Sequence, residues 1–341
     1  MRASMSNRHC EEALLRGPVK PTVSPRGLTT GSIKTIKNTN NFSIFNWTPW
    51  SSHGVTQWVL PVHATMPPRN DIKVKILIIL YLLFFSLTSY AKPKIVVSIT
   101  PISSIVSMLV KDKADIESLA ISSDCPHHYN LKPSDLVKVK NADIAIYINE
   151  QFDGFAEKLI DNHSKNIIKI SDIKSLTTIK DNWHIWLDLN NAAILLQEFA
   201  RIFSENFPEL QEDINNNLFA ALKELNKLQE IKNNELATIK DVILLSDSSE
   251  YFLIKTNIKT AKLYSESQKS LRYISKLEDL IKESNNKCLI LSNEQNSRLY
   301  DKLNAKIIIL NSENWNVQNI NSSTFQNQYL QMIDQVKKCI H

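Results

Sequence analysis

Residues 133–148 read P-S-D-L-V-K-V-K-N-A-D-I-A-I-Y-I and contain one complete change of local structure. Proline presets the backbone dihedral of a first helical turn, so Pro133–Lys140 is expected to be a helix, with Ser134 as its N-cap. Ala142–Ile148 then has the β-branched, apolar character of a buried strand. A helix that leads directly into such a strand is the repeating unit of a sheet covered by helices.

The same alternation continues on the N-terminal and C-terminal sides of this stretch. Strands are expected at Lys94–Ile99, Ile116–Ile121 and Ile167–Ile170, and a helix at Ile102–Val110. Strands alternating with helices favour a parallel sheet with helices on its faces. This part of the chain is therefore predicted to be an α/β lobe.

A long helical period follows this lobe. Apolar residues keep helical spacing from Asn190 to Phe207, and a second apolar stripe with steps of three or four runs through Glu209–Glu235. A helix of that length measures about 40 Å. It is either a spacer between two lobes or part of a single core. We favour the spacer, because the strand–helix alternation resumes directly after it.

The last third of the chain repeats the α/β pattern. Strands are expected at Val242–Leu245, Lys262–Tyr264, Cys288–Leu291 and Lys306–Leu310, with helices at Ile274–Glu283 and Phe325–Lys338. Gly154 is the one glycine after residue 91. A P-loop and a G-x-G-x-x-G fingerprint both need several glycines, so ATP- and NAD-dependent chemistry of the usual kind is excluded.

An export signal is predicted at residues 66–91. Basic residues precede an apolar run of 12 residues, Ile76–Leu87, and the small residues Ser89 and Ala91 occupy the −3 and −1 positions of a cleavage site. The run is shorter than the roughly 20 residues that span a bilayer. A cleaved signal peptide is therefore favoured over a membrane anchor, and the exported chain is expected to begin at Lys92.

Residues 1–65 fit badly in front of a signal peptide, which works from an N-terminus. They contain four of the five glycines and three of the six tryptophans, with no sustained helical or strand period. We expect translation to start at Met66, so that residues 1–65 are an extension that is never made. The alternative is a basic N-terminal arm.

The charge of the chain depends on this boundary. Residues 1–91 carry 10 Lys or Arg and 3 Asp or Glu, which leaves 30 basic and 32 acidic residues in the remaining 250. The net charge of that part is −2, against +5 for the whole sequence. Nucleic-acid binding therefore loses its support. A length of 250 residues suffices for two domains of ordinary size.

Three cysteines follow the cleavage site, namely Cys125, Cys288 and Cys339. An oxidising compartment would allow Cys288 and Cys339 to pair and so to fix the last helix. The alternative is two unrelated thiols. Cys125 is left over and lies beside two histidines.

Two histidine-containing stretches are candidates for a ligand site. Asp124–Tyr129 reads D-C-P-H-H-Y and follows a strand, and Trp183–Trp186 reads W-H-I-W and precedes a helix. Open parallel sheets bind ligands at the carboxyl ends of their strands, and imidazole is a good ligand for zinc and similar ions. Taken alone, a histidine beside tryptophan is more often a packed or hydrogen-bonded residue.

Three stretches resemble the substrate-binding proteins of zinc and manganese ABC transporters, namely Pro126–Ile144, His184–Asp188 (H-I-W-L-D) and the helix Ile274–Glu283. The likeness covers nearly all of residues 94–340. The resemblance implies two Rossmann-like α/β lobes, 92–208 and 237–341, joined by a long rigid α-helix at 209–236. It places the metal site in the inter-lobe cleft. It also implies a periplasmic protein that delivers the ion to a membrane permease. Zinc-type relatives pair a C-lobe cysteine with one near the C-terminus, as proposed for Cys288 and Cys339.

By this resemblance His127 is the first metal ligand and His184 the second. The C-lobe departs from the family pattern, because Ser246 and Asn311 occupy the two usual ligand positions. Two histidines alone do not hold zinc tightly, since tetrahedral sites use three or four protein ligands.

The residues that can complete the site are Asp247, His128, Cys125 and Glu313. Asp247 is the first candidate, with an alternative role as the N-cap of the next helix. His128 also reads as a solvated neighbour, and Cys125 as a small residue in a turn. His163 reads as part of a surface turn.

The predicted function is that of a monomeric transport receptor, which binds zinc and performs no chemistry. Manganese is the alternative ion. One competing hypothesis is a metal-dependent hydrolase, in which two histidines and a carboxylate activate water. It lacks an H-E-x-x-H motif. The other is a degenerate family member that no longer binds metal and serves as an interaction protein.

Overall fold

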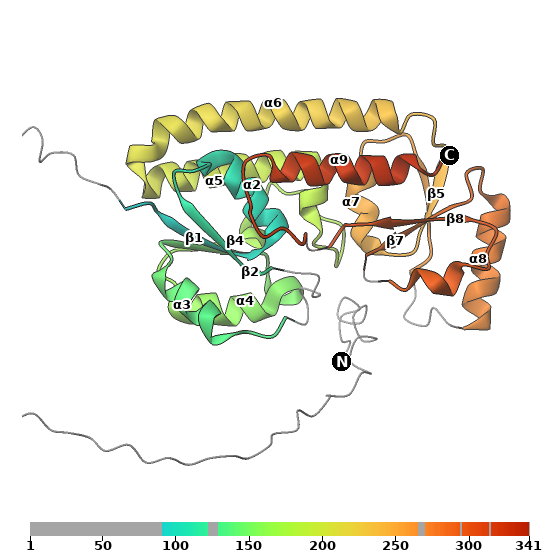
Figure 1. Ribbon diagram of the computed structural model, residues 1–341, viewed down its shortest axis with the longest axis horizontal. Helices are drawn as coiled ribbons and strands as arrows, with labels where there is room; N and C mark the ends of the chain where they lie inside the picture. The colour runs from blue at the N-terminus through green and yellow to red at the C-terminus, as the bar shows by residue number, and fades with distance from the viewer. Residues whose placement is uncertain (1–90, 122–128, 265–269, 294, 314, 341) are drawn as a thin grey trace, which may run out of the picture. The chain divides into compact units, whose positions relative to one another are not determined.

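The computed structural model describes residues 91–121, 129–264, 270–293, 295–313 and 315–340. These residues form two α/β lobes (Figure 1). The proposed signal peptide and the segment before it lie outside the described residues, apart from Ala91. Within the described part, every helix is too short or too polar to cross a membrane.

The N-lobe is built on a four-stranded parallel sheet in the order β2-β1-β3-β4. Its strands are β1 (Lys94–Ile99), β2 (Asp115–Ala120), β3 (Ile144–Tyr147) and β4 (Ile167–Lys169). Its helices are α2 (Thr100–Val110), α3 (Pro133–Asn141), α4 (Glu150–His163) and α5 (Leu189–Asn206). The helices and strands predicted for this lobe are thus present, with ends that differ by a few residues.

Alternate residues of each N-lobe strand serve two different cores, as the two-residue period of a strand requires. Ile95 and Val97 of β1 belong to the main core. Val96 points into a separate cluster under α3 and α4, together with Val139 and Ile160. Both faces of the sheet are therefore covered, which is why the two central strands, β1 and β3, are almost continuously apolar.

The C-lobe repeats this architecture with a parallel sheet in the order β6-β5-β7-β8. Its strands are β5 (Asp241–Leu244), β6 (Lys259–Lys262), β7 (Cys288–Ser292) and β8 (Lys306–Leu310). Its helices are α7 (Glu250–Leu253), α8 (Leu271–Glu283) and α9 (Thr324–Lys337). The predicted fold class, two parallel-sheet α/β lobes with a long helix between them in the sequence, is confirmed.

The long helix α6 (Gln211–Glu235) begins after a short 3-10 helix, η6 (Pro208–Leu210). It lies against α5, α2 and α9 (Figure 1). Ile214, Ala221 and Leu228 are buried in the main core, which also contains residues of both lobes. Helix α6 therefore joins the two lobes, as the spacer interpretation expected, but it is also packed into a core shared by both lobes, which that interpretation did not include.

Three local expectations differ from the structure. The N-cap of α3 is Lys132 and not Ser134, because Pro133 is already the first helical residue. The strand expected at Lys262–Tyr264 lies earlier, at Lys259–Lys262. Its position was misjudged because an edge strand can be polar, and the sequence K-T-A-K is mostly exposed. His163, expected in a turn, is the exposed last residue of α4.

Cys288 and Cys339 form a disulfide, as predicted. It joins the first residue of β7 to the segment after α9, and both cysteines are buried. A loop of this length contributes about 4 kcal/mol to stability in the chain-entropy model. The disulfide therefore fixes the C-terminal helix to the C-lobe sheet.

Candidate metal centre

His184 is carried by a tight turn between the N-lobe sheet and α5. It immediately precedes the 3-10 helix η5 (Ile185–Leu187), whose three side chains are fully buried. Asp188 then caps α5, since its Oδ1 accepts a hydrogen bond from the backbone N–H of Asn190 at 3.0 Å. The buried side chains of η5 and the Asp188 cap fix the backbone on the C-terminal side of His184.

The imidazole of His184 connects the two lobes. Its Nε2 lies 2.7 Å from Oε2 of Glu313, a residue that follows β8 of the C-lobe. Its Nδ1 lies 2.9 Å from Oδ1 of Asn182. The exposed fractions of His184 and Glu313 are 5% and 7%. A buried histidine–carboxylate contact is a strong, charge-assisted interaction whose groups are both able to ligate a metal.

Aromatic rings hold the imidazole on its other sides. The ring centroid of Phe152 lies 5.2 Å away in an edge-on arrangement, and that of Trp186 lies 5.3 Å away. Phe152 and Trp186 also contact each other, at 5.6 Å between centroids. This apolar collar keeps water from one side of the site and strengthens electrostatic interactions within it.

The start of α4 positions Phe152. The carboxylate of Asp153 accepts hydrogen bonds from the backbone N–H groups of Ile148 and Asn149, at 2.8 and 2.9 Å. Asp153 has non-helical dihedrals and is fully buried. Burial raises the pKa of its carboxyl group to about 6, while these hydrogen bonds and Ser98 oppose the rise. The turn that presents Phe152 is thus held by a carboxylate whose charged form is disfavoured.

The alternative role of Asp247, as an N-cap, was wrong. The N-cap of the 3-10 helix η7 (Asp247–Ser249) is Ser246, whose Oγ accepts from the backbone N–H of Ser248 at 3.3 Å. Asp247 is the first residue of η7, and its backbone oxygen accepts a hydrogen bond from Nδ2 of Asn182 at 2.8 Å. The Asp247 side chain is partly exposed. Its role as a ligand stays a prediction.

Hydrogen bonds within the C-lobe occupy the two residues that replace the family's usual ligands. The hydroxyl of Ser246 lies 2.9 Å from that of Ser248, which lies 2.6 Å from the hydroxyl of Ser312. The Asn311 side chain donates to Oε1 of Gln328 on α9, at 3.4 Å. A buried chain of hydroxyl groups and an amide thus lie where carboxylates or histidine would be expected.

The predicted N-lobe residues His127, His128 and Cys125 lie outside the described residues. Among the residues that are described, no group of three or more His, Cys, Asp or Glu side chains is placed to hold a metal ion. The structure therefore brings together one predicted ligand, His184, and one predicted alternative, Glu313. Contact between these two could not be foreseen, because 129 residues separate them in the sequence.

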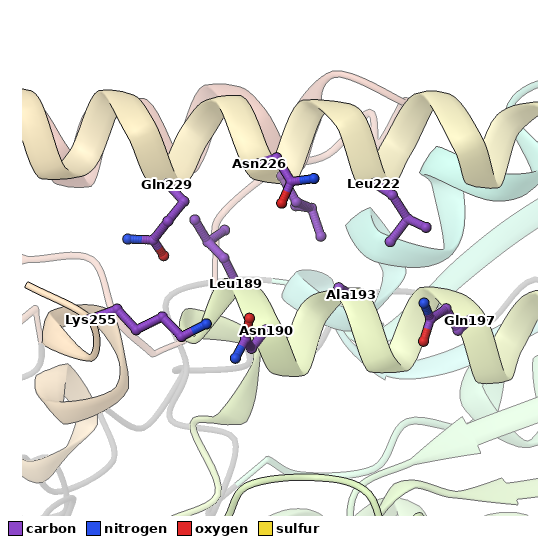
Figure 2. Close-up of a pocket in the computed structure, with 9 residues that line it drawn as sticks. Leu189, Asn190, Ala193, Gln197, Leu222, Asn226, Gln229 and Lys255 are labelled. Carbon is purple, nitrogen blue, oxygen red and sulfur yellow. The ribbon is translucent and has the colours of Figure 1, made fainter.

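A groove of about 310 Å³ lies between α5 and α6 (Figure 2). Leu189, Ala193 and Leu222 line its apolar part, and exposed amide side chains and Lys255 surround it. Neither His184 nor Glu313 lines this groove. It is therefore separate from the candidate metal centre.

Two positions near the centre were not singled out from the sequence. Asn182 contacts His184, the backbone oxygen of Asp247 and the hydroxyl of Tyr251. Lys232 is a fully buried lysine on α6. A signal for Lys232 existed, because it lies four residues after Leu228 and so continues the apolar stripe of α6. Asn182 gave no such signal.

Comparison with known families and structures identifies relatives over most of the chain. The profile of a family described as "ZnuA: Zinc-uptake complex component A periplasmic" matches residues 95–340. A protein of Rickettsia prowazekii (strain Madrid E), RP014, is 80% identical over 265 residues, which cover 77% of this chain and 89% of RP014. The high-affinity zinc uptake system protein ZnuA of Haemophilus ducreyi (strain 35000HP) is 24% identical over 197 residues, covering 48% of this chain and 63% of that protein.

Solved structures show the same fold. A crystal structure of ZnuA superimposes with a TM-score of 0.62 at 18% identity, and covers 74% of this chain and 100% of its own. The periplasmic zinc-binding protein TroA from Treponema pallidum gives a TM-score of 0.63 at 15% identity, with 73% and 99% coverage. The two-lobed arrangement read from the sequence is therefore that of known proteins.

Proposed function

We propose that this chain, which belongs to the family of periplasmic A components of zinc-uptake complexes, captures a divalent metal ion and delivers it to an ABC-type uptake permease. Members of this family are binding proteins of transport systems. The manganese ABC transporter lipoprotein PsaA of Streptococcus pneumoniae is also similar, at 28% identity over 196 residues that cover 52% of this chain and 63% of that protein. The ion is therefore divalent, and its identity follows from the donor atoms.

The observation that carries the proposal is the contact between His184 Nε2 and Glu313 Oε2 at 2.7 Å. Each lobe contributes one group that ligates metals, and both groups are buried. Two ligands of one tetrahedral zinc ion, each about 2.1 Å from it, lie roughly 3.4 Å apart. An opening of less than about 1 Å would thus admit an ion between them.

Glu313 is our preferred C-lobe ligand, ahead of Asp247, because its carboxylate already contacts the imidazole nitrogen that faces the C-lobe. His127 completes the N-lobe pair by family resemblance. Asp247 and His128 are further candidates, and water can take an open position.

Zinc is the ion that this donor set favours. Two imidazoles and one carboxylate suit zinc, and nitrogen-rich sites bind zinc more tightly than manganese in the usual order of divalent ions. Manganese prefers carboxylate, carbonyl and water oxygens. Asn311 stands where the family carries an aspartate, so the C-lobe offers one carboxylate fewer to manganese.

We further propose how the chain is processed and where it acts. Residues 66–91 act as a signal peptide, and residues 1–65 are an extension that is not translated. The exported chain consists of an N-lobe (92–208), a linking helix (209–236) and a C-lobe (237–341). It acts in the periplasm as a monomer, binds no nucleic acid and catalyses no reaction.

Calorimetric titration of the exported chain with zinc, and with manganese in competition, tests this function. We expect one zinc per chain in the native protein. The double variant His127→Ala, His184→Ala should bind none, since two inner-sphere bonds are lost.

Zinc binding that is unchanged in the double variant would show that the site lies elsewhere. A native protein that binds no divalent ion would support the degenerate family member instead. Turnover of ester or peptide substrates by the zinc-loaded protein would support the hydrolase.

A further inference from the structure

We propose that Asn182 is a positioning residue, which holds His184 in the ring orientation and tautomer that metal binding needs and links that orientation to the C-lobe. The effect of Asn182 on metal binding rests on the proposed function. The protonation of His184 Nδ1 does not depend on any metal. Asn182 has an exposed fraction of 3%, so water does not compete for its hydrogen bonds.

The hydrogen bonds of Asn182 determine which end of its amide is oxygen. Its Nδ2 lies 2.8 Å from the backbone oxygen of Asp247, which only accepts. Its Oδ1 lies 3.1 Å from the backbone N–H of His184, which only donates. The reversed amide would lose both bonds, so the atom that faces the imidazole is the oxygen.

The tautomer of His184 follows from this assignment. The atom of Asn182 that lies 2.9 Å from Nδ1 is an acceptor, so Nδ1 must carry a proton and donate it. Nε2 is then the nitrogen that faces Glu313, and a proton must lie between it and the accepting carboxylate oxygen at 2.7 Å. A metal ion that takes the place of this proton binds His184 through Nε2. Histidine ligands of metals commonly donate their other N–H to a fixed acceptor, which orients the ring and raises its basicity.

The C-lobe holds Asn182 through two separate contacts. One is the Asp247 oxygen on η7. The other is the hydroxyl of Tyr251 on α7, which donates to the backbone oxygen of Asn182 at 2.9 Å. Tyr251 is fully buried, and its hydroxyl also accepts from the backbone N–H of Ile179 at 2.7 Å.

The backbone before Asn182 is arranged to support this position. Its N–H donates to the oxygen of Ile179 at 3.0 Å, which closes a tight turn. Asp181, within this turn, has a φ of 60°, a left-handed conformation that costs a non-glycine residue free energy. Contact with the C-lobe through Tyr251 and Asp247 stabilises the turn. Separation of the lobes would therefore remove the contacts that hold the acceptor of His184 in place.

Three variants of the exported chain test the inference. Asn182→Ala removes both the acceptor for His184 and the donor to the C-lobe. Asn182→Asp keeps an acceptor oxygen for Nδ1 but has no N–H for the Asp247 oxygen. Ser107→Ala is the matched control, because it deletes another partly buried hydrogen bond, from Ser107 Oγ to the Asn321 oxygen at 2.8 Å, that does not involve His184.

The first readout is the Nδ1–H proton resonance of His184 in ¹⁵N-labelled, metal-free protein, assigned by its loss in His184→Ala. We expect it in the native chain, in Ser107→Ala and in Asn182→Asp, and expect Asn182→Ala to lose it. The second readout is zinc affinity by competition with a chelator. Asn182→Ala should bind about 10- to 100-fold more weakly, the usual effect of losing such a partner, and Asn182→Asp should stay within about threefold of the native chain.

A retained resonance in Asn182→Ala, or its loss in both Asn182 variants, would overturn the assignment of the tautomer. Equal zinc affinity in Asn182→Ala and Ser107→Ala would overturn the positioning role. Failure of the native chain to bind zinc would contradict the proposed function and leave the resonance as the test of the tautomer.

Discussion

Lys232 offers the sharpest prediction about the fold, because it is a charged residue with no exposed surface. Its Nζ donates to the backbone oxygens of Phe252 and Ile254 at 3.0 and 3.1 Å, and to the hydroxyl of Tyr329 at 3.2 Å. Tyr329 in turn donates to the oxygen of Leu187, in the turn that follows His184. Lys232 thus links α6 to α9 and to the end of α7, near the metal centre.

Burial lowers the pKa of Lys232 from 10.5 to about 8, and the negative charge of Asp188 only partly opposes this effect. The unfolded chain therefore binds more protons than the folded chain between about pH 8 and pH 10.5. The free energy of unfolding should rise with pH in that window. From the two pKa values, the contribution of Lys232 between pH 7 and pH 9.5 is about 2 kcal/mol.

Lys232→Met keeps an unbranched side chain, one atom shorter, and removes the titrating group. The variant should be less stable than the native chain, since two buried carbonyl groups lose their donor. The difference in stability between native and variant should grow by about 2 kcal/mol from pH 7 to pH 9.5. Titrating groups that do not contact Lys232 affect both proteins alike and cancel in the difference.

Urea unfolding followed by tryptophan fluorescence, with the disulfide intact, measures this difference at several pH values. Lys227→Met is the control, because Lys227 is exposed on the same helix. Its stability should follow the native curve at a constant offset. A constant offset for Lys232→Met as well would show that Lys232 titrates normally, and would refute its burial as a charged group.

Three further outcomes are expected. Cys288 and Cys339 of periplasmic protein should resist alkylation until a reductant is added, and reduction should cost about 4 kcal/mol of stability; prompt labelling of both would exclude the disulfide. N-terminal sequencing of the exported protein should begin at Lys92, and a longer N-terminus would contradict the processing proposal. Because burial raises the pKa of Asp153 from 3.8 to about 6, stability should fall by about 2 kcal/mol as pH rises from 4 to 6, and this dependence should be absent in Asp153→Asn.

The sequence was sufficient for most of the architecture because local periodicity determines it. Buried parallel strands such as β1 and β7 are short apolar runs, and α5 and α6 have apolar residues at helical spacing. Helix α4 was not predicted. Its pattern is interrupted near the start by the non-helical Asp153 and by Gly154, a poor helix former.

The candidate site was predictable only where it is local. The motif around His184 predicts by resemblance that this residue is a ligand, and the turn that carries it is short. Glu313, which contacts His184, and Asp247, which contacts Asn182, come from the C-lobe, so these contacts depend on how the lobes pack. The choice between Ser246 and Asp247 as the N-cap of η7 depends on one residue of register, which sequence patterns do not resolve.

The central claim is that a metal ion binds between His184 and Glu313. Anomalous diffraction at the zinc absorption edge, from crystals of the exported chain grown with zinc, locates the ion directly. We predict one peak about 2.0–2.2 Å from His184 Nε2 and from a carboxylate oxygen of Glu313, with Nδ1 still donating to Asn182. The claim would be contradicted by a zinc peak bound by Asp247 without Glu313, by one on His184 Nδ1, or by one far from both His184 and Glu313.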